Sequence, residues 1–228
     1  MNEKSPTYGT SMHYLGSSGL DYLNWQDVHG DIRGKINKRK FRNFDFSQST
    51  VLDFGSGTGN LLNSIDAKVK IAIEINRAAH PIILRRGIFA FTSIEEIPTG
   101  TVDFVISNHA LEHVPYPIQA LREMKRTLKL GGCLLLVVPI DDWRTQKHYD
   151  PNDVNHHLNT WTPLLLGNSL REAGFRVSAS DISIITHAWF PGFYKVYNAP
   201  GFDFLCKVYS ILRKRRQLFA HVTNENLK

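Results

Sequence analysis

The chain has 228 residues, with 27 Lys and Arg against 21 Asp and Glu, and its formal net charge is +6. Its 42% hydrophobic and 21% charged residues are typical of a globular protein with a buried core, and they exclude a disordered chain, a collagen and a coiled coil. The apolar run CLLLVVPI at 133–140 is far shorter than the roughly 20 residues that cross a bilayer. We therefore expect one ordinary domain and no transmembrane helix.

Leader sequence, cysteines and charge clusters bear on where the protein works. The N-terminal sequence MNEKSPTYGT lacks the apolar segment of a secretion signal, and Cys133 and Cys206 are too few for a disulfide framework. We therefore expect a cytoplasmic protein. The basic residues form two clusters, and each is either a solvated helix face or a contact with an anionic partner. The clusters are Lys35, Lys38, Arg39, Lys40 and Arg42, and residues 213–216.

The first part of the chain alternates predicted strands with predicted helices. Two apolar runs predict strands, and each is followed by a helical stretch. Pro81 lies in the second helical stretch and should delay or kink that helix, which Gly87 can end. These elements follow an N-terminal appendage at 1–45, with strands at 50–54 and 70–75 and the first helix around 61–65.

The same alternation continues through the middle of the chain. A strand is predicted at 102–107, and apolar residues at helical spacing predict a helix over 118–128, which Gly131 and Gly132 should end. CLLLVV at 133–138 is a continuous apolar run, typical of a strand buried on both faces of a parallel sheet. Strands that alternate with helices predict an α/β sheet with right-handed crossovers.

The last third departs from this alternation. Thr162 followed by Pro163 predicts the start of a helix that ends at Gly174. Residues 175–184 are then predicted to form one long strand. The remaining elements are an aromatic and basic helical insertion at 188–216 and a final strand at 217–222.

The most informative segment is VLDFGSGTGN at 51–60, where three glycines directly follow a predicted strand. Glycines in that place let the backbone turn tightly and approach a ligand closely. A phosphate-binding P-loop ends in Gly-Lys-Ser/Thr, but Gly59 is followed by Asn60 and Leu61, which excludes it. The dinucleotide fingerprint needs a glycine where Asn60 stands, so the loop is not expected to bind a pyrophosphate.

Two carboxylates accompany this glycine loop. Asp53 lies inside the turn, and a carboxylate beside a ligand suits a cationic group better than a phosphate. Glu74, at the end of the second predicted strand, can accept hydrogen bonds from a ribose diol. Together they predict a nucleoside that carries a positive amine.

A family resemblance rests on five segments in order: VLDFGSGTG, the strand-end Glu74, SIEEIP, VDFVISNHALEHV and LKLGGCLLLVVP. They resemble the successive motifs of class I S-adenosylmethionine-dependent methyltransferases, of the small-molecule and sugar branch, over about residues 50–177. The resemblance implies a Rossmann-like α/β fold. Its seven-stranded sheet would have the order 3-2-1-4-5-7-6, with strand 7 antiparallel and helices on both faces. The segments at 175–184 and 217–222 would supply strands 6 and 7.

The resemblance also implies the cofactor, S-adenosylmethionine, and the residues that would bind it. The glycine loop would hold its methionine part, and Glu74 its ribose hydroxyls. Ile75 and Ile94 would flank the adenine, unless they are ordinary core residues, and Ser93 would lie near its amino edge. Asn108 and His109 would approach the sulfonium, and Tyr14 and Gln26 would cover the cofactor from the appendage. The loop residues are Asp53, Gly55, Ser56, Gly57 and Gly59.

Histidines are dense in two segments of the chain. HALEHV places His109, Glu112 and His113 together, and NHHLNTW adds His157. If residues 109–113 make one helical turn, His109 and His113 share a face. Three interpretations remain. Glu112 and His113 brace the loop, or His113 or His157 is a general base, or the group binds a divalent metal.

The metal interpretation rests on a second resemblance. Ubiquinone-pathway and small-RNA 2′-O-methyltransferases carry a Glu-x-x-Glu-His segment here and a later His, but His109 stands where they have the first Glu. We therefore name His113 and His157 as the catalytic candidates and assign no metal ligand. The protease motif H-x-x-E-H is excluded because it needs a long helix, whereas this segment follows a strand.

The methyl acceptor is less determined by the sequence. Asn108 is not followed by the Pro-Pro-Tyr of amino-group methyltransferases, which favours oxygen as the acceptor. YLGSSGLDYLNWQ at 14–26 and NHHLNTWT are similar to segments of bacterial methyltransferases encoded among surface-polysaccharide enzymes. A small molecule or the hydroxyl of a glycan or nucleotide sugar is the expected acceptor.

Other functions and partners stay open. An RNA methyltransferase would suit the basic clusters but lacks an appended RNA-binding domain, so nucleic acid is not the expected partner. A non-catalytic binding module of the same fold is the other alternative. The aromatic residues of 194–212 and the run at 213–216 either pack over the sheet or contact an anionic membrane. We expect one domain over 1–228, with a cofactor-binding core at 46–187 and a last strand and tail at 217–228.

Overall fold

The computed structural model describes residues 11–16, 19, 21–23, 28–140, 147–186 and 192–225. Seven strands form one sheet in the order β3-β2-β1-β4-β5-β7-β6, and β7 is antiparallel to both of its neighbours. The other pairs are parallel. The predicted α/β fold class, strand order and antiparallel strand 7 are therefore confirmed. The strands are β1 (Thr50–Phe54), β2 (Val69–Ile73), β3 (Phe89–Phe91), β4 (Val102–Asn108), β5 (Leu128–Ile140), β6 (Ile182–Thr186) and β7 (Arg216–Thr223).

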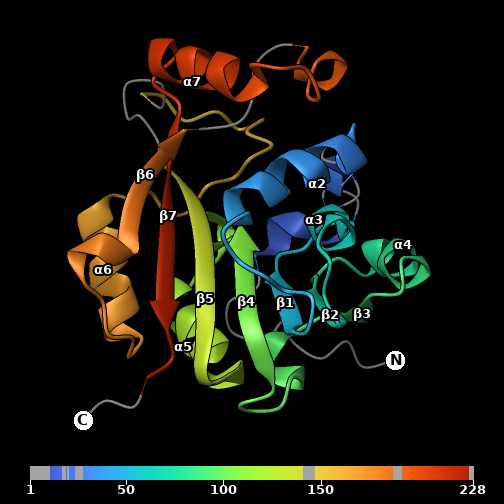
Figure 1. The fold of residues 1–228 in the computed structure, drawn as a ribbon, viewed down its shortest axis with the longest axis vertical. Helices are drawn as coiled ribbons and strands as arrows, with labels where there is room; N and C mark the ends of the chain where they lie inside the picture. Colours follow the sequence, from blue (N-terminus) through green and yellow to red (C-terminus); the bar gives the residue numbers. More distant parts are fainter. Residues whose placement is uncertain are drawn as a thin grey trace.

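Helices cover both faces of the sheet (Figure 1). The α-helices are α2 (Gly30–Lys38), α3 (Asn60–Ser64), α4 (His80–Arg85), α5 (Pro117–Thr127), α6 (Pro163–Glu172) and α7 (Phe202–Leu212). Short 3-10 helices are η1 (Met12–Tyr14), η2 (Arg39–Phe41), η3 (Arg77–Ala79), η4 (Ile94–Glu96), η5 (Leu111–His113), η7 (Ala179–Asp181) and η8 (Phe193–Lys195). Within the described part of the chain, none of these helices has the length and apolar character needed to cross a membrane.

Two apolar layers hold the helices to the sheet. Leu134 and Leu136 of β5 point into the layer formed with α5 and α6. Leu135 and Val137 point into the opposite layer, which α3 and α4 complete. Alternate residues of a strand point to opposite faces, so the stretch of β5 at 134–138 is apolar at every position and serves both layers. Each such Leu, fully buried, contributes roughly 1.5–3 kcal/mol relative to an exposed one.

The predicted end of the helix before β5 is wrong. The helix α5 ends at Thr127, and Leu128 is already extended and pairs with Val102. Gly131 and Gly132 therefore lie inside β5 and do not end a helix. A Cβ at Gly132 would lie 3.0 Å from backbone oxygens of Asp103 and Lys129, beside the register shift between β4 and β5. The glycine there allows close approach of two backbones.

The long strand predicted at 175–184 is also wrong, because β6 begins only at Ile182. Ser178 and Asp181 form a capping box around η7, and the Ser178 N–H donates to Asp181 Oδ2 at 2.7 Å. Such local side-chain bonds compete with extended structure. The second predicted strand likewise ends early, at Ile73, which leaves Glu74 and Ile75 in the loop that follows it.

The helix α7 and the start of β7 lie at the end of the sheet formed by the carboxyl ends of the parallel strands. Arg216, the first residue of β7, aligns with Ile140 at the end of β5 and with Thr186 at the end of β6. The helix α7 immediately precedes β7 and lies over this edge (Figure 1). Its inner face packs against α2 through a small apolar cluster of Ile36, Phe193, Phe202 and Cys206.

Candidate functional site

A pocket lies where β1, β2 and β4 end, at the reversal of strand order between β1 and β4. Ligands of open α/β sheets bind at this place, because the loops on either side of the reversal diverge. Four loops and the N-terminal segment supply its wall. The lining residues include Phe54, Gly55 and Gly57, then Ile73, Glu74, Ile75 and Asn76, then Thr92, Ser93, Ile94 and Glu95, then His109, Ala110 and His113, and finally Ser11, Tyr14, Gly19, Tyr22 and Leu23.

The glycine loop makes a tight turn into this pocket. Gly55, Gly57 and Gly59 all have positive φ, of 75°, 56° and 78°. A Cβ at Gly55 would lie 2.3 Å from the Ala110 Cβ, so the loop after β1 touches the loop after β4. The Gly55 N–H donates to the carbonyl oxygen of Ile73 at 2.9 Å, which ties the turn to the end of β2. Only glycine fits both the backbone conformation and the contact at position 55.

Glu74 is the carboxylate that faces the pocket. It is 8% exposed, and its two oxygens accept the backbone N–H groups of Gly57 and Asn76, each at 2.8 Å. Burial raises the pKa of Glu74 to about 7, although these two N–H groups favour the charged form. Each carboxylate oxygen can accept more than one hydrogen bond, so Glu74 retains capacity for ligand hydroxyl groups.

The structure also brings Ile75, Ser93 and Ile94 to the pocket wall. Ile94 is 6% exposed, and its carbonyl oxygen accepts a hydrogen bond from Arg126 at 3.1 Å, which fixes η4 against α5. The Ser93 hydroxyl caps η4 by accepting the Glu95 N–H at 3.2 Å. Ile75, Ser93 and Ile94 therefore form a rim beside Glu74, of which the η4 part is held by these hydrogen bonds.

Five of the predicted site residues lie outside the residues that line the pocket: Asp53, Ser56, Gly59, Asn108 and His157. Asp53 is 2% exposed inside β1, and its burial first, then the charge of Glu74, raises its pKa well above the usual range. Gly59 is the N-cap residue of α3. Both therefore support the glycine loop from behind. Gln26 lies outside the described residues.

The glycine loop and the pocket wall each hold a buried polar atom without a hydrogen-bond partner among the described residues. These atoms are the Ser56 hydroxyl and the Asn76 side-chain nitrogen. A buried group without a partner is costly, and a ligand that supplies one relieves that cost. Asn76 was not predicted as a site residue. Its place two positions after Glu74, just beyond β2, is the signal that could have identified it.

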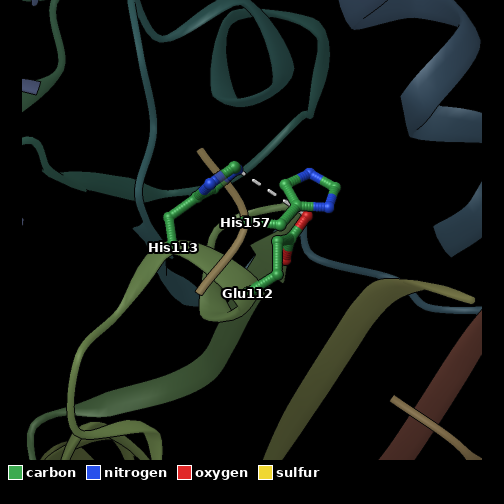
Figure 2. Close-up of side chains that lie close together, drawn as sticks. All are labelled: Glu112, His113 and His157. Atoms are coloured by element: carbon green, nitrogen blue, oxygen red, sulfur yellow. Dashed lines mark ion pairs between the residues drawn. The ribbon is translucent and has the colours of Figure 1, made fainter. Parts of the chain in front are cut away.

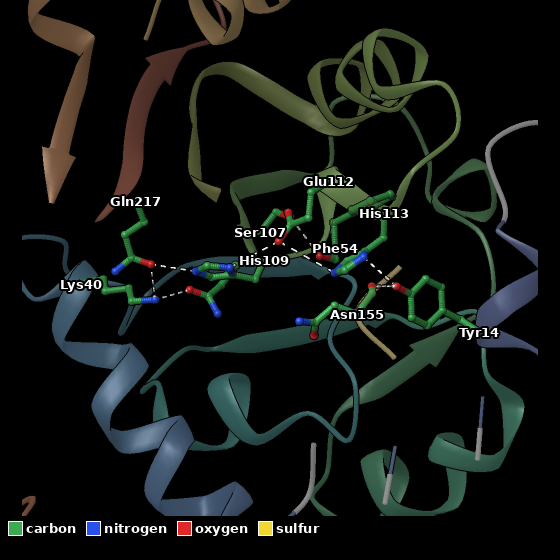
Figure 3. A network of polar contacts seen from close by, with 10 residues as sticks. Tyr14, Lys40, Phe54, Ser107, His109, Glu112, His113, Asn155 and Gln217 are labelled. Atoms are coloured by element: carbon green, nitrogen blue, oxygen red, sulfur yellow. Dashed lines mark hydrogen bonds and ion pairs between the residues drawn. The ribbon is translucent and has the colours of Figure 1, made fainter. Parts of the chain in front are cut away.

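A chain of polar contacts runs behind the pocket from the appendage to β4 and β7 (Figure 3). Lys40 Nζ donates to Asn108 Oδ1 at 2.7 Å and to Gln217 Oε1 at 3.2 Å. Gln217 Oε1 also lies 2.7 Å from His109 Nε2, and His109 Nδ1 lies 3.3 Å from Glu112 Oε1. Burial lowers the pKa of Lys40 to about 7, against the attraction of Glu112. Neither Lys40 nor Gln217 has a local sequence signal that marks it for this site.

The other end of this chain is formed by Tyr14 and His113. The Tyr14 hydroxyl donates to the Asn155 carbonyl oxygen and lies 2.6 Å from His113 Nδ1. His113 Nε2 lies 3.8 Å from Glu112 Oε1. Burial lowers the pKa of His113, and the attraction of Glu112 only partly offsets it. Tyr14, predicted to cover the site, and His113 both line the pocket.

Glu112 is fully buried between these histidines. Burial alone would raise its pKa, but the contacts with His109 and His113 outweigh it, and the pKa lies below the usual value. The helical turn η5 begins only at Leu111, and His109 has a positive φ of 58°. His109 and His113 therefore face Glu112 from either side and do not share one helix face.

His157 lies beside this group because the two residues after it are hydrogen-bonded to the Glu112 backbone. The Glu112 carbonyl oxygen accepts the N–H groups of Leu158 at 2.9 Å and Asn159 at 3.0 Å. The rings of His113 and His157 lie edge to face, 4.9 Å between centroids. The ligand atoms of Glu112, His113 and His157 all lie within 4.8 Å of one another (Figure 2). The group can act in proton transfer or hold a divalent metal, and both interpretations remain open on geometry.

Comparisons with known proteins agree with this architecture. A family model described as a methyltransferase domain matches residues 25–180. A SAM-dependent methyltransferase from Thermotoga maritima superposes with a TM-score of 0.64 at 18% identity, covering 91% of this chain and 96% of that one. One from Archaeoglobus fulgidus gives a TM-score of 0.61 at 17% identity, covering 89% and 99%.

Other comparisons limit what the fold implies. The [4+2]-cyclase SpnF has a TM-score of 0.56 at 18% identity, covering 79% of this chain and 76% of that one. A search of the curated proteins finds no match. The family model spans more than half of the chain and includes the glycine loop and the pocket wall from Phe54 onward. The chain therefore belongs to the methyltransferase-domain family and has the fold of class I S-adenosylmethionine-dependent methyltransferases.

Proposed function

We propose that this protein transfers the methyl group of S-adenosylmethionine to a hydroxyl group of a small molecule, glycan or nucleotide sugar. The observation that carries the proposal is one continuous pocket wall. It runs from the glycine loop through Glu74 to Ile94 on one side and to His113 on the other. A nucleoside site and a proton acceptor thus share a single pocket.

The described residues fit the cofactor. Gly55 and Gly57 would approach its methionine part, and the unpaired Ser56 hydroxyl and Asn76 amide offer donors beside it. Glu74 would accept the ribose hydroxyls. These roles fit the chemistry of the side chains. The Ser56 hydroxyl and the Asn76 nitrogen can donate hydrogen bonds to the cofactor, and the Glu74 oxygens can accept further ones.

Further pocket residues would position the adenine and the sulfonium. Ile75 and Ile94 would flank the adenine, with Ser93 at its edge. His109 would lie on the sulfonium side, and Asn108, whose Oδ1 accepts from Lys40, would support it from behind. Asp53 and Gly59 would act indirectly, through the shape of the loop.

His113 is the group that would take the acceptor's proton. Because the single phenolic proton of Tyr14 is directed to the Asn155 carbonyl oxygen, the proposed tautomer of His113 would carry its proton on Nδ1, toward Tyr14, and keep the lone pair on Nε2. Because burial lowers its pKa, His113 is neutral at pH 7 and can act as a base. The imidazolium that forms would be stabilised by Glu112, 3.8 Å away.

The cofactor would supply an electrophilic methyl group on its sulfonium. As the acceptor oxygen receives this methyl group, the acceptor's proton would go to His113. His157, edge to face with His113, would hold the ring in place. The main contribution of this pocket is orientation of the two reactants.

A tritium-transfer assay tests the proposal. Protein and S-adenosylmethionine labelled in the methyl group are incubated with separated glycan, small-molecule, RNA and protein fractions of cells. Label in the glycan or small-molecule fraction, lost in His113→Ala, supports the proposal. Label in RNA would favour the nucleic-acid alternative. Cofactor binding with no label in any fraction would point to a reaction other than methyl transfer, because this fold also occurs in a cyclase.

A further inference from the structure

The helix α7 has an apolar outer face. Its inner residues Phe202, Cys206 and Ser210 are at most 2% exposed, and they recur every four positions. Between them, apolar side chains face away from the protein. These are Phe204 (68% exposed), Leu205 (49%), Val208 (37%), Ile211 (52%) and Leu212 (74%). A helix on an aqueous surface carries polar residues on its outer face, so this apolar stripe indicates an interaction site.

Basic residues border this stripe. Lys207 and residues 213–216 are exposed, and four of these five follow directly after the last apolar residue, Leu212. The acidic residue of α7, Asp203, is paired with Arg39 at 2.8 Å. We call the five outer apolar residues together with Lys207 and residues 213–216 the α7 surface. Its charge is therefore positive, and its centre is apolar.

The size and charge of the α7 surface decide which partner it fits. A helix of 11 residues is about 16 Å long, so a face about 10 Å wide covers roughly 160 Å². A stable protein interface needs about 800 Å² from each partner. A second copy would also bring its own basic run against this one. An apolar stripe bordered by Lys and Arg is the pattern of helices that lie in the headgroup region of anionic bilayers.

The position of α7 connects this surface to the candidate site. Arg39, which holds Asp203, also lies over the Phe202 ring at 5.0 Å and is followed in the chain by Lys40. Gln217, directly after the basic run, contacts both Lys40 and His109 (Figure 3). The α7 surface thus lies on the same edge of the sheet as the pocket. A bilayer bound there would face the site.

We propose that the α7 surface docks this protein on an anionic lipid bilayer. The apolar stripe enters the headgroup boundary, and residues 213–216 contact the anionic headgroups. A statement about the acceptor rests on the proposed methyltransferase function. On that function, the acceptor hydroxyl belongs to a molecule held at the membrane, such as a lipid-linked glycan. The docking itself does not depend on methyl transfer.

Vesicle co-sedimentation of the full chain tests the docking, without cofactor or acceptor. Vesicles of phosphatidylcholine alone are compared with an equimolar mixture of phosphatidylcholine and phosphatidylglycerol. We expect at least about tenfold more bound protein on the anionic vesicles, and release as salt screens the charges. The double variant Phe204→Ser, Leu212→Ser should lose at least about tenfold in binding, and Arg213→Glu, Lys214→Glu should behave alike.

The control variant comes from α4, which lies between β2 and β3 in the chain, at the other end of the strand order from β7 and β6. Leu84 is 57% exposed and Arg85 is exposed, so Leu84→Ser, Arg85→Glu removes one exposed apolar side chain and reverses one exposed charge at another place. This variant should bind anionic vesicles as the unchanged protein does. Equal loss in the control, equal binding to neutral vesicles, or no binding at all would overturn the docking proposal. So would self-association in sedimentation velocity that Leu212→Ser abolishes, since it would assign the α7 surface to a second copy.

The two proposals fail separately. Methyl transfer to a soluble acceptor with no vesicle binding would reject docking and leave the proposed function intact. Vesicle binding without any methyl transfer would reject the proposed function and leave docking intact.

Discussion

The hydroxyl of Tyr14 lies 2.6 Å from Nδ1 of His113, although the two residues are 99 positions apart in the chain. The contact joins the N-terminal segment to the loop after β4, and both residues line the pocket. The same hydroxyl donates to the Asn155 carbonyl oxygen, so Tyr14 ties the His113 ring to the segment around Asn155. The N-terminal segment therefore contacts the proposed base directly.

Tyr14→Phe keeps the ring and removes this hydrogen bond. We expect turnover to fall by about tenfold, the effect of losing one positioning hydrogen bond of about 1.4 kcal/mol. The dissociation constant of S-adenosylhomocysteine should change by less than about twofold, because the apolar wall is kept. Steady-state kinetics and calorimetry measure the two quantities. An unchanged turnover would mean that Tyr14 only packs against His113.

His113→Ala removes the proposed base. Turnover should fall by about 10²–10⁴-fold, with cofactor affinity nearly unchanged. His157→Ala should lower turnover less, since His157 acts through its contact with the His113 ring. Equal activity of both variants and the unchanged protein would reject a catalytic histidine.

The pH dependence of turnover gives a second test of His113. A base must be unprotonated, so turnover should fall as the pH drops through its pKa. Burial lowers the pKa of His113, so this fall should occur at a lower pH than an exposed histidine would give. A turnover that is already lost as the pH drops from alkaline values to neutrality would contradict this assignment.

Removal of metals separates the base from the metal interpretation of Glu112, His113 and His157. If His113 is the base, dialysis against a strong chelator should leave turnover unchanged. The measurement is activity before and after dialysis, then after addition of zinc, manganese or magnesium. Loss that one of these ions restores would reassign the three residues as metal ligands.

Glu74→Gln tests the pKa of the pocket carboxylate. Because the folded-state pKa of Glu74 is raised to about 7, folding takes up a proton between about pH 4.5 and pH 7. The unchanged protein therefore loses stability as pH rises through that window, whereas the glutamine variant does not. The free energy of unfolding of the variant, relative to the unchanged protein, should rise by roughly 2 kcal/mol from about pH 5 to about pH 8. Denaturant unfolding at both values measures it, and a pH-independent difference would contradict the raised pKa.

Gly55→Ala tests the contact between the loops after β1 and β4. The new Cβ would lie 2.3 Å from the Ala110 Cβ in a backbone with φ of 75°. Gly87→Ala is the matched control, because Gly87 has φ of 71° and open space around it. Both variants should lose about 1–2 kcal/mol from the left-handed backbone, and Gly55→Ala should lose roughly 1–3 kcal/mol more. Equal losses would show that the two loops yield without strain.

Local sequence signals were sufficient to predict β1, β2, β4, β5 and β7, whereas the strand order followed from the family resemblance and β3 was not predicted. The glycine loop, Glu74 and Ser93 each lie at the end of a strand or the start of a helical turn, and the strand order places such ends together. Local signals failed where two local rules competed. Gly131 looks like a helix end but lies within β5, and the Ser178 capping box interrupts an otherwise strand-like run.

The contacts behind the pocket could not be predicted, because they join distant segments. Lys40 meets Gln217 across 177 positions, and Asn159 reaches the Val114 carbonyl oxygen across 45. Neither pair has a sequence pattern of its own. The density of histidines in two segments predicted a general base or a metal site in them. The enclosure of Glu112 by His109 and His113, however, follows from tertiary structure alone.

The central claim is that the pocket between the glycine loop and Glu74 holds the cofactor. Titration calorimetry of S-adenosylhomocysteine tests it most directly, with the unchanged protein, Glu74→Gln and the surface variant Glu172→Gln on α6, whose side chain is 65% exposed and does not line the pocket. We predict one binding site per chain, an affinity reduced by about 10–100-fold in Glu74→Gln because a donor NH2 group replaces one of the two buried acceptor oxygens, and near-normal affinity in Glu172→Gln. No binding to the unchanged protein, or equal binding to all three proteins, would contradict the assignment of this pocket.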